Sequence, residues 1–202
     1  LSALGQVALH GCAAAFERGA FGILGETGAG KSTLAAAFSR NGVPVLTDDC
    51  LVVDKDGDTY YAQPSYPEIR LWPDALDRLF DGAQEMVRGN RYSDKMRLSI
   101  GVHGLAYATN RVPLRALFFI DEPGPKNVLT LEPMRPTDAS FRVLGSMFRM
   151  LPVVGKARGE EFQAVTDLVA SIPCFTLGYP KQIDQLDSTV RAVLEQVERI
   201  HS

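Results

Sequence analysis

One segment constrains this chain more than any other: Gly25-Glu26-Thr27-Gly28-Ala29-Gly30-Lys31-Ser32. It satisfies the phosphate-binding loop (P-loop) pattern of a glycine, four residues of any type and then Gly-Lys-Ser or Gly-Lys-Thr. The preceding residues 20–25, "AFGILG", read as a strand, and residues 31–42, "KSTLAAAFSRNG", read as a helix closed by Asn41-Gly42. A glycine-rich loop between a strand and a helix predicts an α/β fold that binds a nucleoside triphosphate.

Each part of this loop has a physical role in the prediction. The glycines let backbone N–H groups converge on phosphate oxygens at the positive end of the following helix. The Lys31 ammonium can reach the β- and γ-phosphates, and the Ser32 hydroxyl can bind Mg²⁺. The predicted nucleotide-binding set is the loop and the residue after it: Gly25, Glu26, Thr27, Gly28, Ala29, Gly30, Lys31, Ser32 and Thr33.

Composition sets outer limits on the kind of protein. With 202 residues, 46% of them hydrophobic, residues 1–202 are expected to form a single domain. The net charge of −3 offers no basic surface for nucleic acid. No apolar run approaches the roughly 20 residues of a membrane span. The cysteines, Cys12, Cys50 and Cys174, have neither disulfide nor metal spacing, which favours a reducing cytoplasm. Because the sequence begins with Leu1 and not with Met, the presence of an N-terminal region before it is an open question.

Strand and helix patterns alternate along the rest of the chain. Early strands are expected at 7–16, 43–49, 50–54, 59–63 and 69–72, with tight turns at 17–19 and 54–58. A helix is expected at 73–80 and a loop at 81–97. Later elements are strands at 115–121, 127–133 and 174–179, a helix after an N-cap at Thr137, and helices at 160–171 and in the amphipathic tail. This order predicts an α/β fold with a mixed central sheet.

The reaction depends on more than the loop, because many nucleotide-binding proteins share it. The guanine-reading Asn-Lys-x-Asp pattern of G-proteins and the signature segment of transporter ATPases are both absent. Two adjacent carboxylates, Asp48 and Asp49, end the predicted strand "VPVLTDD", and neighbours on a strand point to opposite faces. One could serve Mg²⁺ while the other takes the proton of an acceptor hydroxyl, or orients water in a plain hydrolase.

Four segments taken together resemble the catalytic domain of the HPr kinase/phosphorylase family: "LHG" at 9–11, "GETGAGKS" at 25–32, "TDD" at 47–49 and "PEIRLW" at 67–72. His10 lies 21 residues before Lys31, and Asp49 lies 18 residues after it, as in the family's pattern. The likeness is clearest over residues 7–80 and looser over 110–200. It implies an α/β P-loop kinase domain with a mixed central sheet that uses ATP and Mg²⁺.

The resemblance also implies roles for individual residues. Asp49 falls on the family's proton acceptor, which activates a serine hydroxyl, and Asp48 falls near the metal. His10 matches an active-site histidine, and Glu68 matches a Mg²⁺ ligand in a Glu-x-Arg segment that includes Arg70. The implied catalytic residues are Asp49, Lys31, His10 and Arg70, and the implied metal ligands are Ser32, Asp48 and Glu68.

The chain departs from the family after Arg70, where a glycine-rich stretch is replaced by "LWPDALDRLF". The family's further catalytic arginine has no clear counterpart, so its role is open among Arg91, Lys95, Arg97, Arg115 and Arg135. The motifs "YPEIRLWPDAL" and "IPCFTLGYPKQIDQL" are closer to stand-alone relatives, some of which phosphorylate the C-terminal serine of lasso-peptide precursors.

Three functional classes therefore stay open. A serine kinase acting on a peptide or small protein is the expected one. A small-molecule kinase would phosphorylate a metabolite without any peptide, and a regulatory ATP-binding module would tolerate the loss of Asp49. HPr kinases assemble as hexamers, so the resemblance implies a homo-oligomer, which no residue pattern in this chain tests.

Overall fold

The computed structural model describes residues 6–66, 68–80, 87–88, 96–99, 106–122, 127–148 and 156–200. The strands are β1 (Gln6–Phe16), β2 (Gly19–Leu24), β3 (Val45–Thr47), β4 (Cys50–Asp56), β5 (Thr59–Gln63), β6 (Glu68–Leu71), β7 (Val87–Arg88), β8 (Met96–Ser99), β9 (Val112–Asp121), β10 (Thr130–Pro133) and β11 (Cys174–Gly178). The helices are α1 (Lys31–Arg40), α2 (Pro73–Phe80), α3 (Pro136–Gly145), α4 (Lys156–Ser171) and α5 (Leu186–Arg199), with a 3-10 turn, η2 (Ile183–Gln185).

The central sheet is mixed. Its strand order is β10-β11-β9-β2-β1-β4-β5, with β3 paired to β1. The strands β2, β9 and β11 run parallel, whereas β1 is antiparallel to both β2 and β4. The strand β5 also pairs with the start of β9, so the sheet curls back on itself at that end. A separate three-stranded sheet, β6-β8-β7, lies beside it.

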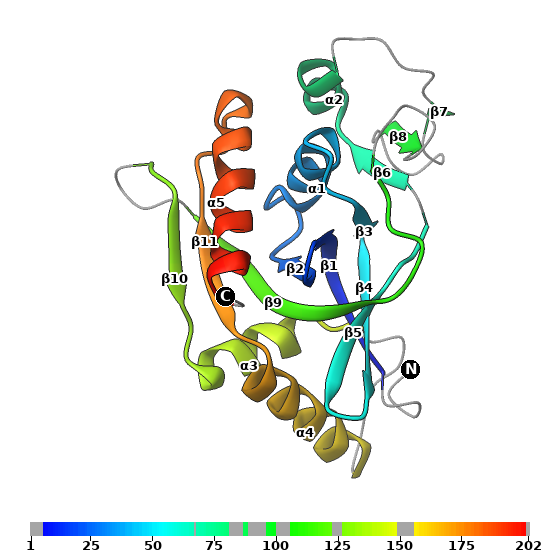
Figure 1. The fold of residues 1–202 in the computed structure, drawn as a ribbon, viewed down its shortest axis with the longest axis vertical. Coiled ribbons are helices and arrows are strands. Elements are labelled where there is room, and N and C mark those ends of the chain that lie inside the picture. The colour runs from blue at the N-terminus through cyan, green and yellow to red at the C-terminus, as the bar shows by residue number, and fades with distance from the viewer. Residues whose placement is uncertain are drawn as a thin grey trace.

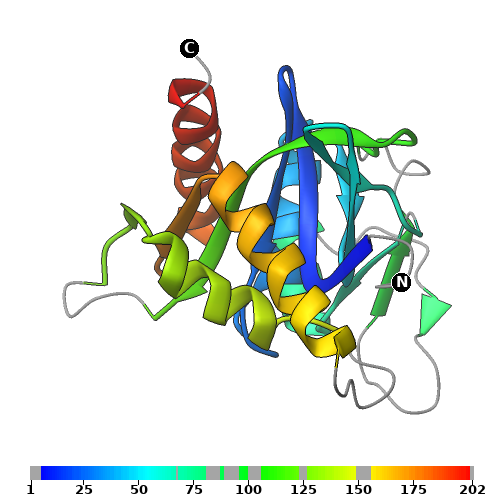
Figure 2. The same cartoon turned by 90° about the horizontal axis from the view of Figure 1, so that it is seen from below.

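Helices cover the main sheet on both faces (Figures 1 and 2). On one face, α1, α2 and α5 pack with β6 and with one set of side chains from β9, such as Phe118. On the other face, α3 and α4 pack on the opposite set, such as Leu117 and Phe119. Because β9 is buried on both sides, its apolar residues form a continuous run, "ALFFI", instead of alternating with polar ones.

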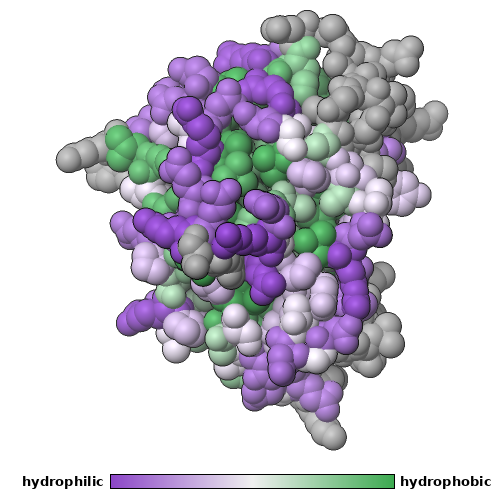
Figure 3. Space-filling view, in the orientation of Figure 1, coloured by the Kyte–Doolittle hydropathy of each residue, from purple (hydrophilic) through white to green (hydrophobic). Residues whose placement is uncertain are grey.

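The amphipathic tail lies with its apolar stripe inward. Leu186, Val190, Val193 and Val197 of α5 are buried against α1 and β11. Charged residues such as Arg191 and Glu198 are exposed on the outer side of α5. Figure 3 shows the surface of the face seen in Figure 1, where hydrophobic residues near the middle are surrounded by hydrophilic ones. Core packing therefore accounts for the stripe.

The predicted α/β fold with a mixed sheet is confirmed, whereas the predictions for residues 81–97 and for the start of α3 are wrong. Residues 81–97 were predicted to be a loop, but β7 lies within this range and β8 begins inside it. These strands form because β8 pairs with β6, a contact between segments that are far apart in the chain. Thr137 is not the N-cap of α3: Arg135 occupies that position, and Pro136 takes the first helical turn, where its missing N–H costs nothing.

The parallel strands determine where a site can form. The P-loop follows β2, Glu122 follows β9, and Tyr179 follows β11. The carboxyl ends of these three strands therefore lie at one edge of the sheet. In open α/β sheets this edge is where ligands bind.

Candidate functional site

The P-loop joins the end of β2 to the start of α1. Gly28 and Gly30 have φ values of 85° and 106°, in the left-handed region that favours glycine. Gly30 is the N-cap of α1 and, being a glycine, brings no capping side chain to that helix end. The positive N-terminus of α1 therefore faces the loop, where an anion can bind.

The Lys31 ammonium lies at the centre of this loop. Its Nζ donates hydrogen bonds to the carbonyl oxygens of Gly25, at 2.8 Å, and Glu26, at 2.9 Å. The lysine is buried, so its charge is poorly screened by solvent. A positive charge at this point would attract the β- and γ-phosphates of a nucleotide bound along the loop.

The hydroxyl of Tyr179 holds the loop from the side of β11. It donates to the Ala29 carbonyl oxygen at 3.3 Å, and burial raises the pKa of this phenol, so the donor stays protonated at neutral pH. A Cβ added at Gly30 would collide with the same hydroxyl. The glycine is thus required both by its left-handed backbone and by the tyrosine beside it.

Gly30→Ala is therefore expected to disturb the loop without unfolding the protein. Placing a non-glycine residue in a strained backbone region costs about 1–3 kcal/mol, and Tyr179 is too buried to move aside freely. We expect a lower melting temperature and at least tenfold weaker ATP binding, measured by calorimetry. Gly159→Ala is the matched control, because Gly159 is exposed on α4 and a Cβ there meets nothing within 4 Å. Unchanged ATP binding in Gly30→Ala would contradict this view of the loop.

The two carboxylates lie in a bend between β3 and β4, and not on a strand as the sequence had indicated. Alternation along a strand therefore does not explain their different surroundings. Asp48 is only 5% exposed, and its Oδ2 accepts a hydrogen bond from the Arg70 backbone N–H at 2.9 Å. The side chain of Asp49 is half exposed. The bend leaves one carboxylate inside the site and the other at its open side.

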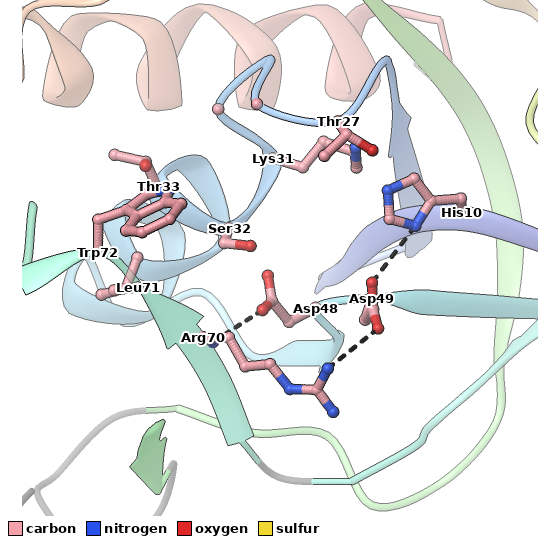
Figure 4. Close-up of a pocket in the computed structure, with 12 residues that line it drawn as sticks. His10, Thr27, Lys31, Ser32, Thr33, Asp48, Asp49, Arg70, Leu71 and Trp72 are labelled. Atoms are coloured by element: carbon pink, nitrogen blue, oxygen red, sulfur yellow. Dashed lines mark hydrogen bonds and ion pairs between the residues drawn. The ribbon is translucent and has the colours of Figure 1, made fainter. Parts of the chain in front are cut away.

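Two side chains hold Asp49 from opposite sides (Figure 4). Its Oδ1 lies 3.3 Å from His10 Nδ1, and its Oδ2 lies 3.4 Å from an Arg70 guanidinium nitrogen. His10 in turn packs edge-on against Phe148, with 5.4 Å between ring centroids. These contacts are long, so the carboxylate oxygens keep lone pairs for a further donor. They orient Asp49 while leaving it accessible.

One pocket brings most of the predicted residues together, and we call it the loop pocket. It has a volume of about 120 Å³ and is lined by His10, Thr27, Gly28, Gly30, Lys31, Ser32, Thr33, Asp48, Asp49, Arg70, Leu71 and Trp72. Figure 4 shows Ser32 and Asp48 on neighbouring sides of this space, with His10 and Asp49 at one end and Trp72 at the other. The remaining loop residues, Gly25, Glu26 and Ala29, do not line it.

The thiols around the site are not acidic. Burial, reinforced by the charge of Asp48, raises the pKa of Cys12, which packs beneath the start of α1. Partial burial and the nearby Asp49 likewise raise the pKa of Cys50. Both thiols stay protonated at neutral pH, which makes them poor nucleophiles and poor metal ligands.

Glu68 lies at the edge of a second pocket, the acid-side pocket, of about 430 Å³. This pocket is lined by Asp48, Asp49, Cys50, Ser65, Tyr66, Glu68, Arg70 and Arg97. Glu68 and Arg70 share the outer face of β6, as the i, i+2 spacing predicts, and Arg97 of β8 lies 3.7 Å from the Glu68 carboxylate. Among the described residues, no three His, Cys, Asp or Glu side chains group closely enough to hold a metal ion.

The oxygen donors at the loop nevertheless suit Mg²⁺. This ion is usually held by one or two carboxylates together with substrate phosphates and water, rather than by a full protein cage. The Ser32 hydroxyl and the Asp48 carboxylate both line the loop pocket. Glu68 lines only the acid-side pocket, so its role as a ligand, like that of the other two, stays a prediction.

Several predicted cations lie away from these pockets. Arg115 is near the start of β9, where its Cγ lies against Gly19 at the start of β2. The side chain of Arg135 pairs with Asp138. The neighbouring Met134 donates its backbone N–H to the carbonyl oxygen of Cys174, at the start of β11. Both arginines therefore lie toward the edge of the sheet opposite the P-loop. Arg91 and Lys95 fall outside the described residues.

Three residues near the loop were missed by the sequence reasoning: Trp72, Tyr179 and Arg142. Arg142 of α3 bonds to the Ile120 carbonyl oxygen and pairs with Asp121 at 2.8 Å. It lines a third pocket, the α3 pocket, together with His10, Gly25, Glu26, Thr27, Phe119, Gly145 and Ser146. Tyr179 closes the predicted strand 174–179, and its position at the carboxyl end of that strand is the one signal that could have identified it. Nothing in the sequence around Arg142 points to the loop.

The fold and the site define an α/β protein with a P-loop, whose lysine, serine and adjacent acids line one pocket. The structure is similar to that of the Hpr(Ser) kinase/phosphatase from Coxiella burnetii. The two are 13% identical, the match covers 95% of this chain and 98% of the other, and the TM-score is 0.46. No protein-family model and no curated protein sequence matches this chain. The assignment of function therefore rests on the residues of the site.

A membrane-spanning helix was not expected from the sequence. Within the part of the chain that the structure describes, none of the helices combines the length and the apolar character needed to cross a bilayer.

Proposed function

We propose that this protein is an ATP- and Mg²⁺-dependent kinase that transfers the γ-phosphoryl group to a serine hydroxyl of a peptide or small protein. The observation that carries the proposal is the position of Asp49. It is held between His10 and Arg70 in the same pocket as Lys31 and Ser32 of the P-loop. A carboxylate positioned across a phosphate-binding loop is the arrangement that phosphoryl transfer to a hydroxyl requires.

Each residue then has a definite task. Lys31 holds the β- and γ-phosphates by charge, and the N-terminus of α1 binds them through backbone N–H groups. Ser32 and Asp48 would hold Mg²⁺, which would offset the negative charge of the phosphates. Arg70 donates to Asp49 and lines the same pocket, so it can orient the base and balance the charge of the transferred group.

The proposed step is a direct displacement. The acceptor oxygen forms a bond to the γ-phosphorus while the bond between that phosphorus and the β–γ bridging oxygen breaks. The hydroxyl proton passes to a carboxylate oxygen of Asp49, and ADP leaves. The half-exposed position of Asp49 supports this role, because an acceptor must reach it from outside.

The direct test is transfer of labelled γ-phosphate from ATP in the presence of Mg²⁺. We expect label on a serine-containing peptide and none on the same peptide with alanine in place of serine. Label that appears only on small metabolites would replace this proposal with a small-molecule kinase. Slow release of inorganic phosphate with no labelled acceptor, unchanged in Asp49→Asn, would replace it with a regulatory ATP-binding module.

The acceptor that we favour is a flexible peptide with a serine at its C-terminus. The resemblance to peptide-tailoring kinases suggests it, and the acid-side pocket supports it by adjoining Asp49 and containing the guanidinium of Arg97. Arg97 is paired with Glu68 at 3.7 Å, a long contact that a terminal carboxylate could replace. Arg135, a supplier of charge on sequence grounds, lines neither this pocket nor the loop pocket.

Amidating the C-terminus of such a peptide is expected to lower kcat/KM at least about tenfold, because a charge-assisted contact to the carboxylate is lost. In Arg97→Ala the free-acid and amidated peptides should become nearly equal substrates. Arg135→Ala, which removes an arginine outside the pocket, is the matched control and should keep the preference. Faster phosphorylation of folded HPr than of any such peptide would overturn this choice of acceptor, as would equal rates for both peptide forms with the unmodified enzyme.

A further inference from the structure

A fourth pocket adjoins the P-loop on the side away from Asp49, and we call it the nucleoside pocket. Its volume is about 400 Å³, and it is lined by Gly28, Gly30, Thr33, Trp72, Asp74, Ala75, Arg78, Tyr179, Lys181, Gln182, Ile183 and Leu186. Four of these residues also line the loop pocket: Gly28, Gly30, Thr33 and Trp72. The two spaces are therefore continuous around the start of α1.

A bound nucleoside triphosphate must extend beyond the loop pocket. That pocket has a volume of about 120 Å³, whereas sites for small molecules usually measure about 300–1,000 Å³. The phosphates fit beside Lys31 and Ser32, so the sugar and base have to occupy a neighbouring space. Among the pockets formed by the described residues, the nucleoside pocket, the acid-side pocket and the α3 pocket each share residues with the loop pocket.

Charge and position favour one of the three. The acid-side pocket meets the loop pocket at Asp48, Asp49 and Arg70, on the side from which the acceptor must reach Asp49. The α3 pocket meets the loop pocket at His10 and Thr27, beside Asp49, the general base that the acceptor must reach. The nucleoside pocket opens at Thr33, the residue after Ser32. It contains the cations Arg78 and Lys181 along with Asp74.

Trp72 stands at the junction. It is 54% exposed, although tryptophan is a large side chain that usually packs inside or binds something. Figure 4 shows its indole beside Thr33, at the opposite end of the loop pocket from His10 and Asp49. Tyr179 and the start of η2 form another part of the pocket. An exposed indole at this point can stack on a nucleobase.

We infer that this pocket binds the nucleoside of the phosphoryl donor, with its base stacked on Trp72. This inference rests on the proposed function, because it assumes that the P-loop binds the phosphates. It adds a specific prediction, namely that the protein distinguishes a nucleoside triphosphate from inorganic tripolyphosphate. Because every base has an aromatic face, stacking of this kind should accept more than one base.

The chain offers a direct probe, since Trp72 is its only tryptophan. In the intact protein with Mg²⁺, ATP and GTP are expected to change its fluorescence, whereas tripolyphosphate should bind with little change. By calorimetry, Trp72→Ala should weaken ATP binding about 5- to 100-fold and leave tripolyphosphate binding unchanged. Trp72→Phe should keep most of the ATP affinity. Phe162→Ala removes an exposed aromatic side chain from α4 and is the matched control, with no expected effect on either ligand.

The outcomes separate this inference from the proposed function. ATP and tripolyphosphate that bind equally well, with equal fluorescence changes and no effect of Trp72→Ala, would overturn the nucleoside pocket and leave the kinase proposal intact. Tighter binding of ATP than of tripolyphosphate, lost in Trp72→Ala and without any phosphoryl transfer, would support the nucleoside pocket and contradict the kinase proposal. Failure of both ligands to bind would overturn both.

Discussion

Lys31→Ala is expected to abolish phosphoryl transfer and to weaken the binding of Mg²⁺·ATP severely. The ammonium is buried at the centre of the P-loop, where it bonds to the carbonyl oxygens of Gly25 and Glu26. No other lysine lines the loop pocket within the described residues. Because Lys31 is buried, solvent screens its charge poorly, and its removal takes from the β- and γ-phosphates their main cationic partner from the protein.

Calorimetry with ATP and with tripolyphosphate, together with a transfer assay, measures this effect. Both ligands should be affected, because the lysine acts on the phosphates and not on the base. Lys55→Ala is the matched control, since Lys55 is exposed on β4 and lies over the ring of Tyr60. Its affinity and transfer rate should equal those of the unmodified protein. Normal ATP affinity in Lys31→Ala would show that this loop does not hold the phosphates.

Asp49→Asn is expected to separate binding from chemistry. We expect the transfer rate to fall by about 10²–10⁴, the usual contribution of a positioned general base. The affinity for Mg²⁺·ATP should stay nearly the same, because asparagine has the same shape and Lys31 and Ser32 remain in place. The removed negative charge would, if anything, favour a polyanionic ligand. The half-exposed position of Asp49 also limits any loss of stability.

Single-turnover transfer and ATP binding should be measured on the same Asp49→Asn preparation. Asp58→Asn is the matched control, because Asp58 is exposed in the turn between β4 and β5. An equal loss of binding and rate would mean that Asp49 acts in holding the nucleotide or the metal, and would assign the base to another group. Full transfer activity in Asp49→Asn would contradict the proposed kinase mechanism.

The parts of the site nearest the P-loop were predictable because their signals are local. The left-handed glycines, the lysine and the following helix form one continuous segment, so their geometry follows from about ten residues. The strands "VALHGCAAAF" and "CLVVD" were predicted from their local pattern, whereas their antiparallel pairing as β1 and β4, which places His10 opposite Cys50 and therefore near Asp49, was not. Motif spacing gave the same neighbourhood.

Other features depend on contacts between distant segments and could not be predicted in this way. Arg142 reaches the α3 pocket because α3 crosses the sheet toward His10, whose backbone N–H bonds to the carbonyl of Ser146. Arg135 and Arg115 seemed suitable by charge alone, yet they lie toward the far edge of the sheet. The pairing of β8 with β6 brings Arg97 beside Glu68, although a loop was expected there.

By itself, the sequence determined the α/β character, the mixed sheet and the P-loop, because hydrophobic periodicity and a glycine-rich turn act over a few neighbouring residues. Only the tertiary structure decided the surroundings of the two acids, since the bend between β3 and β4 buries Asp48 against the backbone of Arg70 and exposes Asp49. It also decided that Trp72 and Tyr179, 107 positions apart in the chain, line one pocket at the P-loop. Such contacts follow from how α2, β11 and α5 pack around α1, and packing of this kind leaves no periodic trace in the sequence.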